Sequence, residues 1–425
     1  MMQIASDVEA QTMDYRSRRR VVLDVCVQTA LTLLGMGIVV PVLPIYASSF
    51  HINFTLTGII IAAFGVARIF VNIPAGRLTE RLGYRGLLIA GPLILCFGAA
   101  LNGMATGFWT LLMSRLIEGA GSALYTTTAM SYLAQISPAH ERGHVMGYHQ
   151  GSILIGASLG PIFGGYLSDH LGFRAPFFIY GALVGCGALW TCWRMKERNG
   201  RRQETLPGKA EAEREGRKVK LLEIIFERNL VLANLVTFAV FFTRAGAQLM
   251  IIPLFGYGVA ALTSSQVGTA LTSASLLNLV TMFTSGKQTQ RFGRKRMIVF
   301  GAAVAALSLV FFPFLAHGLW SYLACTIFYG LGTGIVVPAL AAYVVDTPAT
   351  AGRYGIAMGV YRTYGDVGYI LAPMLMGWLS DVTHGYVWPL LLNGLMMGLM
   401  GTLFWARGIE STHHQQVSVE QLPLS

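Results

Sequence analysis

The sequence predicts an all-α polytopic membrane protein, and three features of its composition point to that fold class. Of its 425 residues, 54% are hydrophobic and only 12% are charged, whereas soluble domains average about 25% charged residues. Its 49 glycines are typical of helices that pack closely in lipid. Since a spanning helix needs roughly 20 residues and a short loop, the chain has room for about twelve spans.

The individual spans follow from the apolar runs, taken in chain order. Each run is long enough to cross a bilayer, and charges, glycines or prolines separate it from the next. The first run is too long for the apolar core of a cleavable signal peptide, so we assign it as the first spanning helix. The predicted spans are residues 21–46, 56–75, 86–103, 108–136, 145–167, 177–195, 229–254, 266–286, 297–315, 320–346, 354–380 and 386–407.

The net charge of +11 orients the chain in the membrane and does not indicate nucleic-acid binding. Of the 31 Lys and Arg residues, 26 lie in the termini and loops of a single side, and Arg174 is the only basic residue in the opposite loops. Loops rich in Lys and Arg are retained in the cytoplasm. We therefore expect both termini to be cytoplasmic, in a bacterial inner membrane.

A charged segment divides the chain into two halves. Residues 194–228 hold eleven basic and seven acidic side chains, a composition typical of a solvated tether. We expect an N-terminal six-helix bundle at 1–193, a cytoplasmic linker at 194–228, a C-terminal six-helix bundle at 229–410 and a cytoplasmic tail at 411–425.

The two halves repeat one another. Four short segments of the first half recur in the second half, in the same order and at offsets of 209 to 212 residues. The matching pairs are Pro44 with Pro253, Gly76–Gly83 with Gly286–Gly293, Glu118–Gly121 with Tyr329–Gly332, and Pro161–Asp169 with Pro373–Asp381. Such a repeat predicts two pseudo-symmetric bundles related by an axis along the membrane normal.

The segment after the second span resembles the cytoplasmic signature of the major facilitator superfamily. It reads Gly76-x-Leu78-x-Glu80-Arg81-x-Gly83-x-Arg85, with Glu80 where the family usually has Asp. The resemblance implies a gating latch across the cytoplasmic ends of neighbouring helices, substrate binding between the two halves, and transport by rocking. In the second copy Gln290 replaces the acid, so we expect a weaker latch there.

Three further segments resemble motifs of the twelve-helix drug:proton antiporters. They are Leu34-Gly35 with Pro41-Val42-Leu43-Pro44, Arg115-x-x-Glu118-Gly119-x-Gly121, and Gly156-x-x-x-Gly160-Pro161-x-x-Gly164-Gly165-x-Leu167. Glycines at every fourth position drift by only about 40° per step, so Gly156, Gly160 and Gly164 share a face that another backbone can approach. Pro161 permits a bend. Ordinary small-residue packing is the alternative explanation of this face.

Charged side chains inside the spans are the candidates for proton coupling, because each costs at least about 2.5–3.5 kcal/mol at mid-bilayer. Arg115 and Glu118 share one face of their helix, and the resemblance assigns the matching arginine to proton coupling. Burial favours a neutral carboxylic acid, whereas an adjacent arginine favours the carboxylate. Movement of Arg115 would therefore let Glu118 capture or release a proton, and a static ion pair is the alternative.

Four other intramembrane charges have open roles. Arg362 and Asp366 lie one helical turn apart, within reach of each other. They could form a structural ion pair or a second site of proton coupling. Asp24 lies near the start of the first span, where helix capping is the alternative to function. Arg68 lies deeper than its cytoplasmic basic cluster and can extend toward the interface.

The middle of the seventh span contains Arg244, which is a candidate ligand for an anionic or carboxylated substrate. Aromatic side chains would supply the walls of the substrate cavity. The candidates are Tyr125, Tyr148, Tyr361, Tyr364 and Phe241.

The sequence predicts neither an enzyme nor a metal or cofactor site. It has no phosphate-binding glycine loop, its nine histidines are scattered, and its five cysteines lack metal-ligand spacing. We expect a monomer that exports a small drug-like molecule or metabolite by proton antiport, with substrate, protons and the lipid bilayer as its partners. A dedicated exporter of one metabolite or siderophore, an importer of the same fold, a non-transporting sensor and a membrane enzyme are the alternatives.

Overall fold

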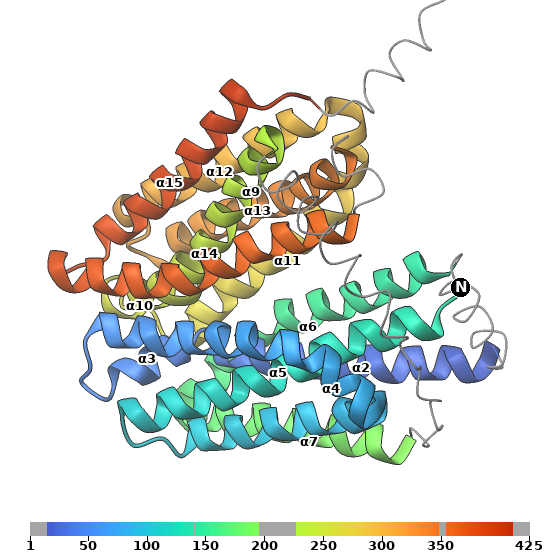
Figure 1. Ribbon diagram of the computed structural model, residues 1–425. Helices are drawn as coiled ribbons and strands as arrows, with labels where there is room; N and C mark the ends of the chain where they lie inside the picture. The colour runs from blue at the N-terminus through green and yellow to red at the C-terminus, as the bar shows by residue number, and fades with distance from the viewer. Residues whose placement is uncertain (1–14, 139–140, 195–226, 348–353, 411–425) are drawn as a thin grey trace, which may run out of the picture. The chain divides into compact units, whose positions relative to one another are not determined.

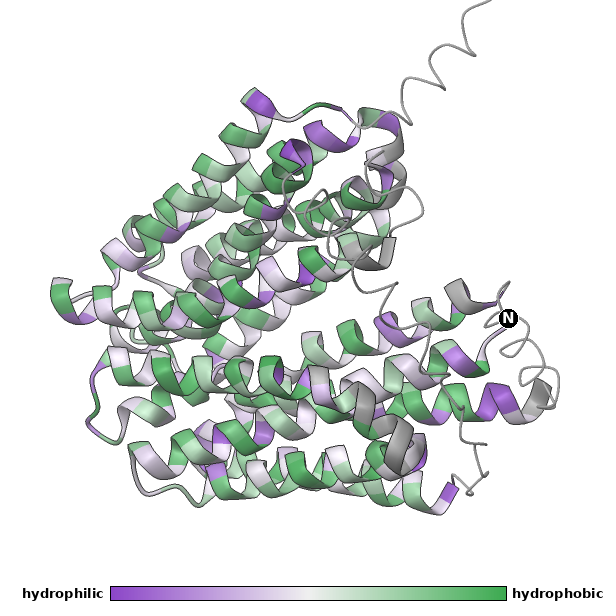
Figure 2. Ribbon diagram, in the orientation of Figure 1, coloured by the Kyte–Doolittle hydropathy of each residue, from purple (hydrophilic) through white to green (hydrophobic). Residues whose placement is uncertain are grey.

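The computed structural model describes residues 15–138, 141–194, 227–347 and 354–410, and their secondary structure is helical (Figure 1). Ten helical segments in this part of the chain are long and apolar enough to cross a membrane, and Figure 2 shows hydrophobic residues along the helices. Two further helices, α5 (Phe108–Ile136) and α14 (Tyr354–Thr383), have 29 and 30 residues and coincide with the remaining predicted spans.

The described residues form two compact units. Unit 1 takes in the chain up to residue 202 and residues 263–272, and unit 2 takes in residues 203–262 and 273–425. Most of the predicted linker and the whole predicted tail lie outside the described residues. The helices of unit 1 are α2 (Tyr15–Val39), α3 (Leu43–Ser48), α4 (Phe54–Gly103), α5, α6 (Arg142–Leu171) and α7 (Ala175–Arg194).

Unit 2 begins with a span in three pieces and continues through five longer helices. Its first span consists of α9 (Arg228–Thr243), the π-helix η2 (Arg244–Ile251) and α10 (Ile252–Gly258). The other helices are α11 (Ser264–Phe292), whose first residues belong to unit 1, α12 (Arg294–Leu315), α13 (Leu319–Asp346), α14 and α15 (Val387–Arg407).

Backbone conformation confirms the internal duplication. The positive-φ positions of the described residues pair between the two halves, as His51 with Ala261, Gly83 with Gly293, and Gly172 with His384, at offsets of 210, 210 and 212 residues. Gly83 (φ 74°) turns the chain inside α4, so this element contains two predicted spans, and Gly293 (φ 89°) turns it between α11 and α12. Glycine adopts this region at no steric cost.

Packing partners repeat in the same way. In unit 1, α2 packs on α6 and α7, while α4 packs on α5 and α7. In unit 2, α9 packs on α14 and α15, while α12 packs on α13 and α15. The corresponding helices of each half therefore build the same kind of bundle.

The first predicted span is interrupted, which the sequence analysis did not anticipate. Helix α2 ends at Val39, a turn covers residues 40–42, and α3 begins at Leu43. Pro41 has no N–H and disfavours a helical conformation for the residue before it. Pro44 lies in the first turn of α3, and its counterpart Pro253 lies in the first turn of α10.

Candidate functional site

A buried ion pair lies on α5, toward its outer end in the predicted orientation. The side chains of Arg115 and Glu118 are three residues apart, and the two residues are only 4% and 0% exposed. The Nη1 atom of Arg115 donates to Oε2 of Glu118 at 2.7 Å. The helical spacing thus brings together the two charges that the sequence analysis placed on one face.

The carboxylate has a second donor from α4. The Nδ2 atom of Asn102 donates to Oε2 of Glu118 at 2.6 Å, and Ser114 Oγ donates to Asn102 Oδ1 at 2.5 Å. Oxygen Oε1 of Glu118 is buried and has no hydrogen-bond partner among the described residues. One carboxylate oxygen therefore accepts two hydrogen bonds, whereas the other accepts none of good geometry, with the Tyr180 hydroxyl close to the carboxylate.

Aromatic rings enclose the pair. The guanidinium carbons of Arg115 and Arg68 lie 4.8 and 5.8 Å from the centroid of the Phe64 ring, within the range of a cation–π contact. The Tyr180 ring from α7 packs against Gly35 of α2. Its hydroxyl is within electrostatic reach of Glu118 but has no hydrogen bond of good geometry. The pair is thus enclosed by side chains of unit 1.

The glycine face of α6 packs against α2. A Cβ at Gly156, Gly160 or Gly164 would collide with backbone atoms of α2, including the carbonyls of Ala30 and Ile38. The face therefore allows contact between two backbones, which larger residues would prevent.

The C-terminal end of α6 contacts the start of α11, which belongs to unit 1. A Cβ at Gly165 would collide with the Ser264 carbonyl. The Asp169 carboxylate accepts hydrogen bonds from the N–H groups of Ser264 and Ser265, at 3.1 and 2.8 Å. Four residues before Gly165, Pro161 presents its carbonyl to Gly268 of α11.

The cytoplasmic signature is described only in part. The side chains at Gly76, Glu80 and Arg81 lie outside the described ones, so the predicted latch stays a prediction. Gly83 provides the turn, and Arg85 Nη2 donates to the carbonyl of Cys192 near the end of α7 at 3.2 Å.

The loop between α11 and α12 is the second copy of the cytoplasmic signature, and two acidic residues from outside this copy bind it. The Glu410 carboxylate accepts from the N–H groups of Arg294 and Lys295 at 2.8 and 3.1 Å, which caps the start of α12. The guanidinium of Arg294 pairs with Asp346 at the end of α13. The side chain of Gln290 is outside the described ones. This role of Glu410 could not be predicted from the sequence, because Glu410 lies far along the chain, beyond the last span.

The alternative of helix capping for Asp24 is wrong. Helix α2 begins at Tyr15, six residues before the predicted start of the span, so Asp24 lies well beyond the first turn. Its carboxylate accepts from Trp190 Nε1 at 3.2 Å and from Arg194 Nε at 3.4 Å. Asp24 is 6% exposed and joins α2 to α7.

The candidate aromatic walls differ in exposure. Tyr125 is 1% exposed, and its hydroxyl lies 2.8 Å from Thr29 Oγ1 and donates to the Val25 carbonyl at 3.1 Å. In this structure Tyr125 is therefore a core residue that holds α5 against α2. Tyr361 is also buried, whereas Tyr148 is 67% exposed.

Unit 2 places Arg244 at the first position of the π-helix, with its side chain exposed. Among the described residues, Arg244 has no ion-pair partner. Phe241, one turn earlier, packs its ring against Gly365 of α14, and Tyr364 beside it is half-buried. A π-helix is rare and often marks a functional site.

The two charges that the sequence analysis placed in the eleventh span lie in the N-terminal half of α14. Arg362 is exposed and Asp366 is half-buried, one turn apart, and each makes interactions with other groups. In the described part of the chain, no group of three or more His, Cys, Asp or Glu side chains could hold a metal ion.

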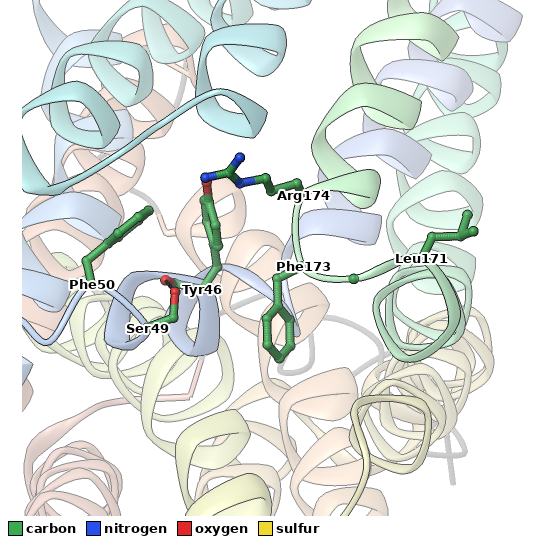
Figure 3. A pocket seen from close by; sticks show the side chains of 7 residues that line it. Tyr46, Ser49, Phe50, Leu171, Phe173 and Arg174 are labelled. Atoms are coloured by element: carbon green, nitrogen blue, oxygen red, sulfur yellow. Dashed lines mark hydrogen bonds between the residues drawn. The ribbon is translucent and has the colours of Figure 1, made fainter.

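A cavity of about 450 Å³ lies at the end of unit 1 where α3 meets the loop between α6 and α7 (Figure 3). The guanidinium of Arg174 bonds the Tyr46 hydroxyl, which donates to the Ala105 carbonyl at 3.1 Å. Arg174, the one basic residue that the sequence places in the loops opposite the basic side, therefore contacts Tyr46 within unit 1.

The duplicated helical bundles and these motifs can be compared with known families. The sequence model of the Major Facilitator Superfamily matches residues 25–265 and 250–425. The chain belongs to the Major Facilitator Superfamily. It is accordingly an integral membrane transporter and not an enzyme.

Several curated members of the superfamily are similar over most of their length. Multidrug resistance protein 2 of Bacillus subtilis (strain 168) is 27% identical over 379 residues, which cover 88% of this chain and 92% of that protein. Quinolone resistance protein NorA of Staphylococcus aureus is 24% identical over 353 residues, which cover 83% of this chain and 88% of that protein.

Solved structures of superfamily members share the fold. A bacterial homolog of the human lysosomal transporter Spinster matches with a TM-score of 0.77 at 16% identity, over 97% of this chain and 100% of that chain. The D-xylose-proton symporter matches with a TM-score of 0.72 at 16% identity, over 92% and 98%. The predicted fold class is confirmed.

Proposed function

We propose that this superfamily member exports a small organic molecule, drug-like or a metabolite, in exchange for protons by alternating access. It would act in a bacterial inner membrane, with both termini in the cytoplasm. Two observations support export: relatives are named for multidrug and quinolone resistance, and the glycines of the antiporter motif make the backbone contact between α6 and α2.

The observation that carries the proton step is the geometry of Glu118. Its carboxylate is fully buried, with Arg115 and Asn102 on one oxygen and no described partner on the other. Removing one partner of a buried ion pair costs about 3–5 kcal/mol, because a buried charge is left uncompensated. If α5 or its neighbours move so that Arg115 separates from Glu118, protonation of the carboxylate relieves that cost. Return of Arg115 expels the proton.

Arg244 is the proposed contact for substrate. An exposed guanidinium in the middle of a span is costly in lipid, so a water-filled cavity is the environment that suits it. Arg244 has no ion-pair partner among the described residues. Its guanidinium N–H groups can therefore donate hydrogen bonds to a carboxylate or another anionic group of the substrate.

The test of the proton step is proton flux in vesicles. The purified protein is reconstituted with a trapped pH dye, and candidate drugs and metabolites are added to find those that move protons. Glu118→Gln keeps the size and an oxygen that can accept from Asn102 but cannot release a proton, so it should retain substrate binding and lose proton-driven export.

Glu227→Gln is the matched control, because Glu227 caps α9 by accepting from the Leu230 N–H at 2.6 Å, a bond that glutamine preserves. The control should export like the wild type. Proton-driven export by Glu118→Gln at the wild-type rate would exclude Glu118 as the carrier. A flux of protons in the same direction as the substrate would indicate an importer.

Arg244→Gln tests the substrate contact separately. It should weaken binding of anionic substrates and leave binding of neutral ones unchanged, because only the charge is removed. Equal loss for both kinds of substrate would mean that Arg244 supports the fold of the π-helix and does not select substrate.

A further inference from the structure

A line of polar side chains runs through unit 1 where α2 packs against α7. On α2, Asp24, Gln28 and Thr32 recur every fourth residue, so they share a face. On α7, Tyr180 and Thr191 lie on the buried side. All five residues are at most 6% exposed, and we call them the polar seam.

Contacts give the order of these residues along the seam. At its cytoplasmic end in the predicted orientation, Asp24 bonds Trp190 and Arg194. Next, the Gln28 side chain packs directly on Gly187. Further along, the Tyr180 ring packs on Gly35 of α2 and its hydroxyl faces Glu118.

The seam connects Glu118 with the cytoplasmic end of the bundle. At 1.5 Å per residue, the eleven residues from Asp24 to Gly35 span roughly 16 Å of α2, about half of the hydrocarbon thickness. Thr32 lies between Gln28 and Gly35 on the same face of α2.

Unpartnered polar atoms mark the whole length of the seam. Among the described residues, hydrogen-bond partners are missing for Gln28 Oε1, Thr32 Oγ1, Thr191 Oγ1, the Tyr180 hydroxyl and Glu118 Oε1, all of them buried. Buried polar atoms are nearly always paired, and each unpaired one costs about 1–3 kcal/mol. Apolar residues would pack this interface at lower cost, so the polar side chains need a reason other than stability.

We propose that the polar seam is the route by which protons leave Glu118 for the cytoplasm, and that Asp24 is the relay at its end. This inference rests on the proposed antiport. A small separation of α2 from α7 would admit a file of water molecules, and the unpaired atoms of Gln28, Thr32 and Thr191 would hydrogen-bond to it.

Each proton transfer along this route is balanced. The carboxylic acid of Glu118 gives its proton to the water beside Tyr180 and becomes a carboxylate paired with Arg115, with Arg68 nearby. Water carries the proton along the file, since an amide side chain orients water but does not carry protons. The Asp24 carboxylate, which faces Arg194, accepts the proton and gives it to cytoplasmic water.

Substitutions of Asp24, the proposed relay, and of Gln28, a residue that would orient the water, test the route in proteoliposomes. Asp24→Asn should lower substrate-dependent proton flux by about tenfold or more, as loss of a positioned proton-transfer group does. Gln28→Leu should also lower the flux, because the file of water loses a side chain that orients it. Both should retain substrate counterflow at zero pH gradient, which requires no net proton release. Asp24→Glu restores a titratable group and should recover most of the flux.

Two controls separate proton transfer from structure. Asn234→Leu removes a buried, unpartnered amide oxygen from α9 of unit 2 and should leave proton flux unchanged. Arg194→Gln weakens the contact between α2 and α7 but keeps the Asp24 carboxylate, so it should reduce flux far less than Asp24→Asn. The thermal unfolding midpoint of Gln28→Leu should not fall, because the variant loses an unpaired amide oxygen and only a long hydrogen bond, of 3.5 Å, from Gln28 Nε2 to the Val184 carbonyl.

The outcomes are distinct. Wild-type proton flux in both Asp24→Asn and Gln28→Leu would overturn the route. Equal losses of proton flux in Arg194→Gln and Asp24→Asn would also overturn it. So would loss of substrate counterflow together with proton flux in Asp24→Asn and Gln28→Leu. If Asp24→Asn does not fold, Gln28→Leu decides by the same criteria. Absence of substrate-dependent proton flux in the wild-type protein would instead refute the proposed antiport itself.

Discussion

Replacing Gly160 by alanine should loosen the contact between α6 and α2, and the structure indicates by how much. The added Cβ would collide with Gly37 and lie 2.6 Å from the Leu34 carbonyl oxygen. Both obstacles are backbone atoms of α2, so no side chain can rotate away. The two helices must move apart or bend.

The free energy of unfolding changes through two opposing effects. Overpacking a well-packed interior costs typically 1–3 kcal/mol, so about that much stability is lost. Alanine gains about 1 kcal/mol over glycine in a helix, because it restricts the unfolded chain. A Cβ added at Gly151 on the same helix would have no neighbouring atom within 4 Å, so Gly151→Ala isolates the second effect.

The comparison of Gly160→Ala with Gly151→Ala therefore measures the packing cost alone, about 1–3 kcal/mol. Thermal unfolding of the purified variants should place the midpoint of Gly160→Ala clearly below that of Gly151→Ala. Proton-driven export in vesicles should fall for Gly160→Ala and stay at the wild-type level for Gly151→Ala. Equal midpoints and equal export rates would refute a tight backbone contact at Gly160.

Three further predictions use the same purified protein. Glu410→Ala should lower the stability of unit 2 by about 0.5–2 kcal/mol, measured by thermal unfolding, because the start of α12 loses its cap; an unchanged midpoint would contradict that role. If Arg362 and Asp366 only hold each other, replacing both by leucine should preserve folding and proton coupling better than replacing either, whereas a folded but uncoupled double variant would assign them to the proton step. A cysteine at Arg174 should react with an impermeant reagent from outside and one at Arg201 should not, and the opposite pattern would reverse the topology.

Local helical geometry explains which site features the sequence predicted. Arg115 and Glu118 are three residues apart on one helix, so their contact needs no knowledge of neighbouring helices. The shared face of Gly156 and Gly160 follows from the same period. The turn at Gly83 follows from a residue type that alone adopts positive φ without strain.

Features that depend on helix rotation and on neighbours could not be predicted. Asn102 meets Glu118 only because α4 packs on α5, and Tyr180 faces the pair only because α7 closes the bundle. Hydropathy placed the start of the first helix six residues late, since basic residues precede the apolar run. For the same reason Asp24 was misplaced in the first turn, and Tyr125 was assigned to a cavity wall although it lies in the core.

The duplicated halves differ at the residues of the proposed chemistry. The counterpart of Glu118 under the repeat is Tyr329, a neutral residue whose hydroxyl reaches Thr243 at 3.4 Å. Arg244 of unit 2, whose side chain is exposed, corresponds to Gly35 in unit 1 at the offset of the Pro44 and Pro253 pair. The proposed proton carrier and the proposed substrate contact therefore each lack a charged counterpart in the other half. In the proposed antiport, proton and substrate influence each other through the conformational equilibrium that both of them bias.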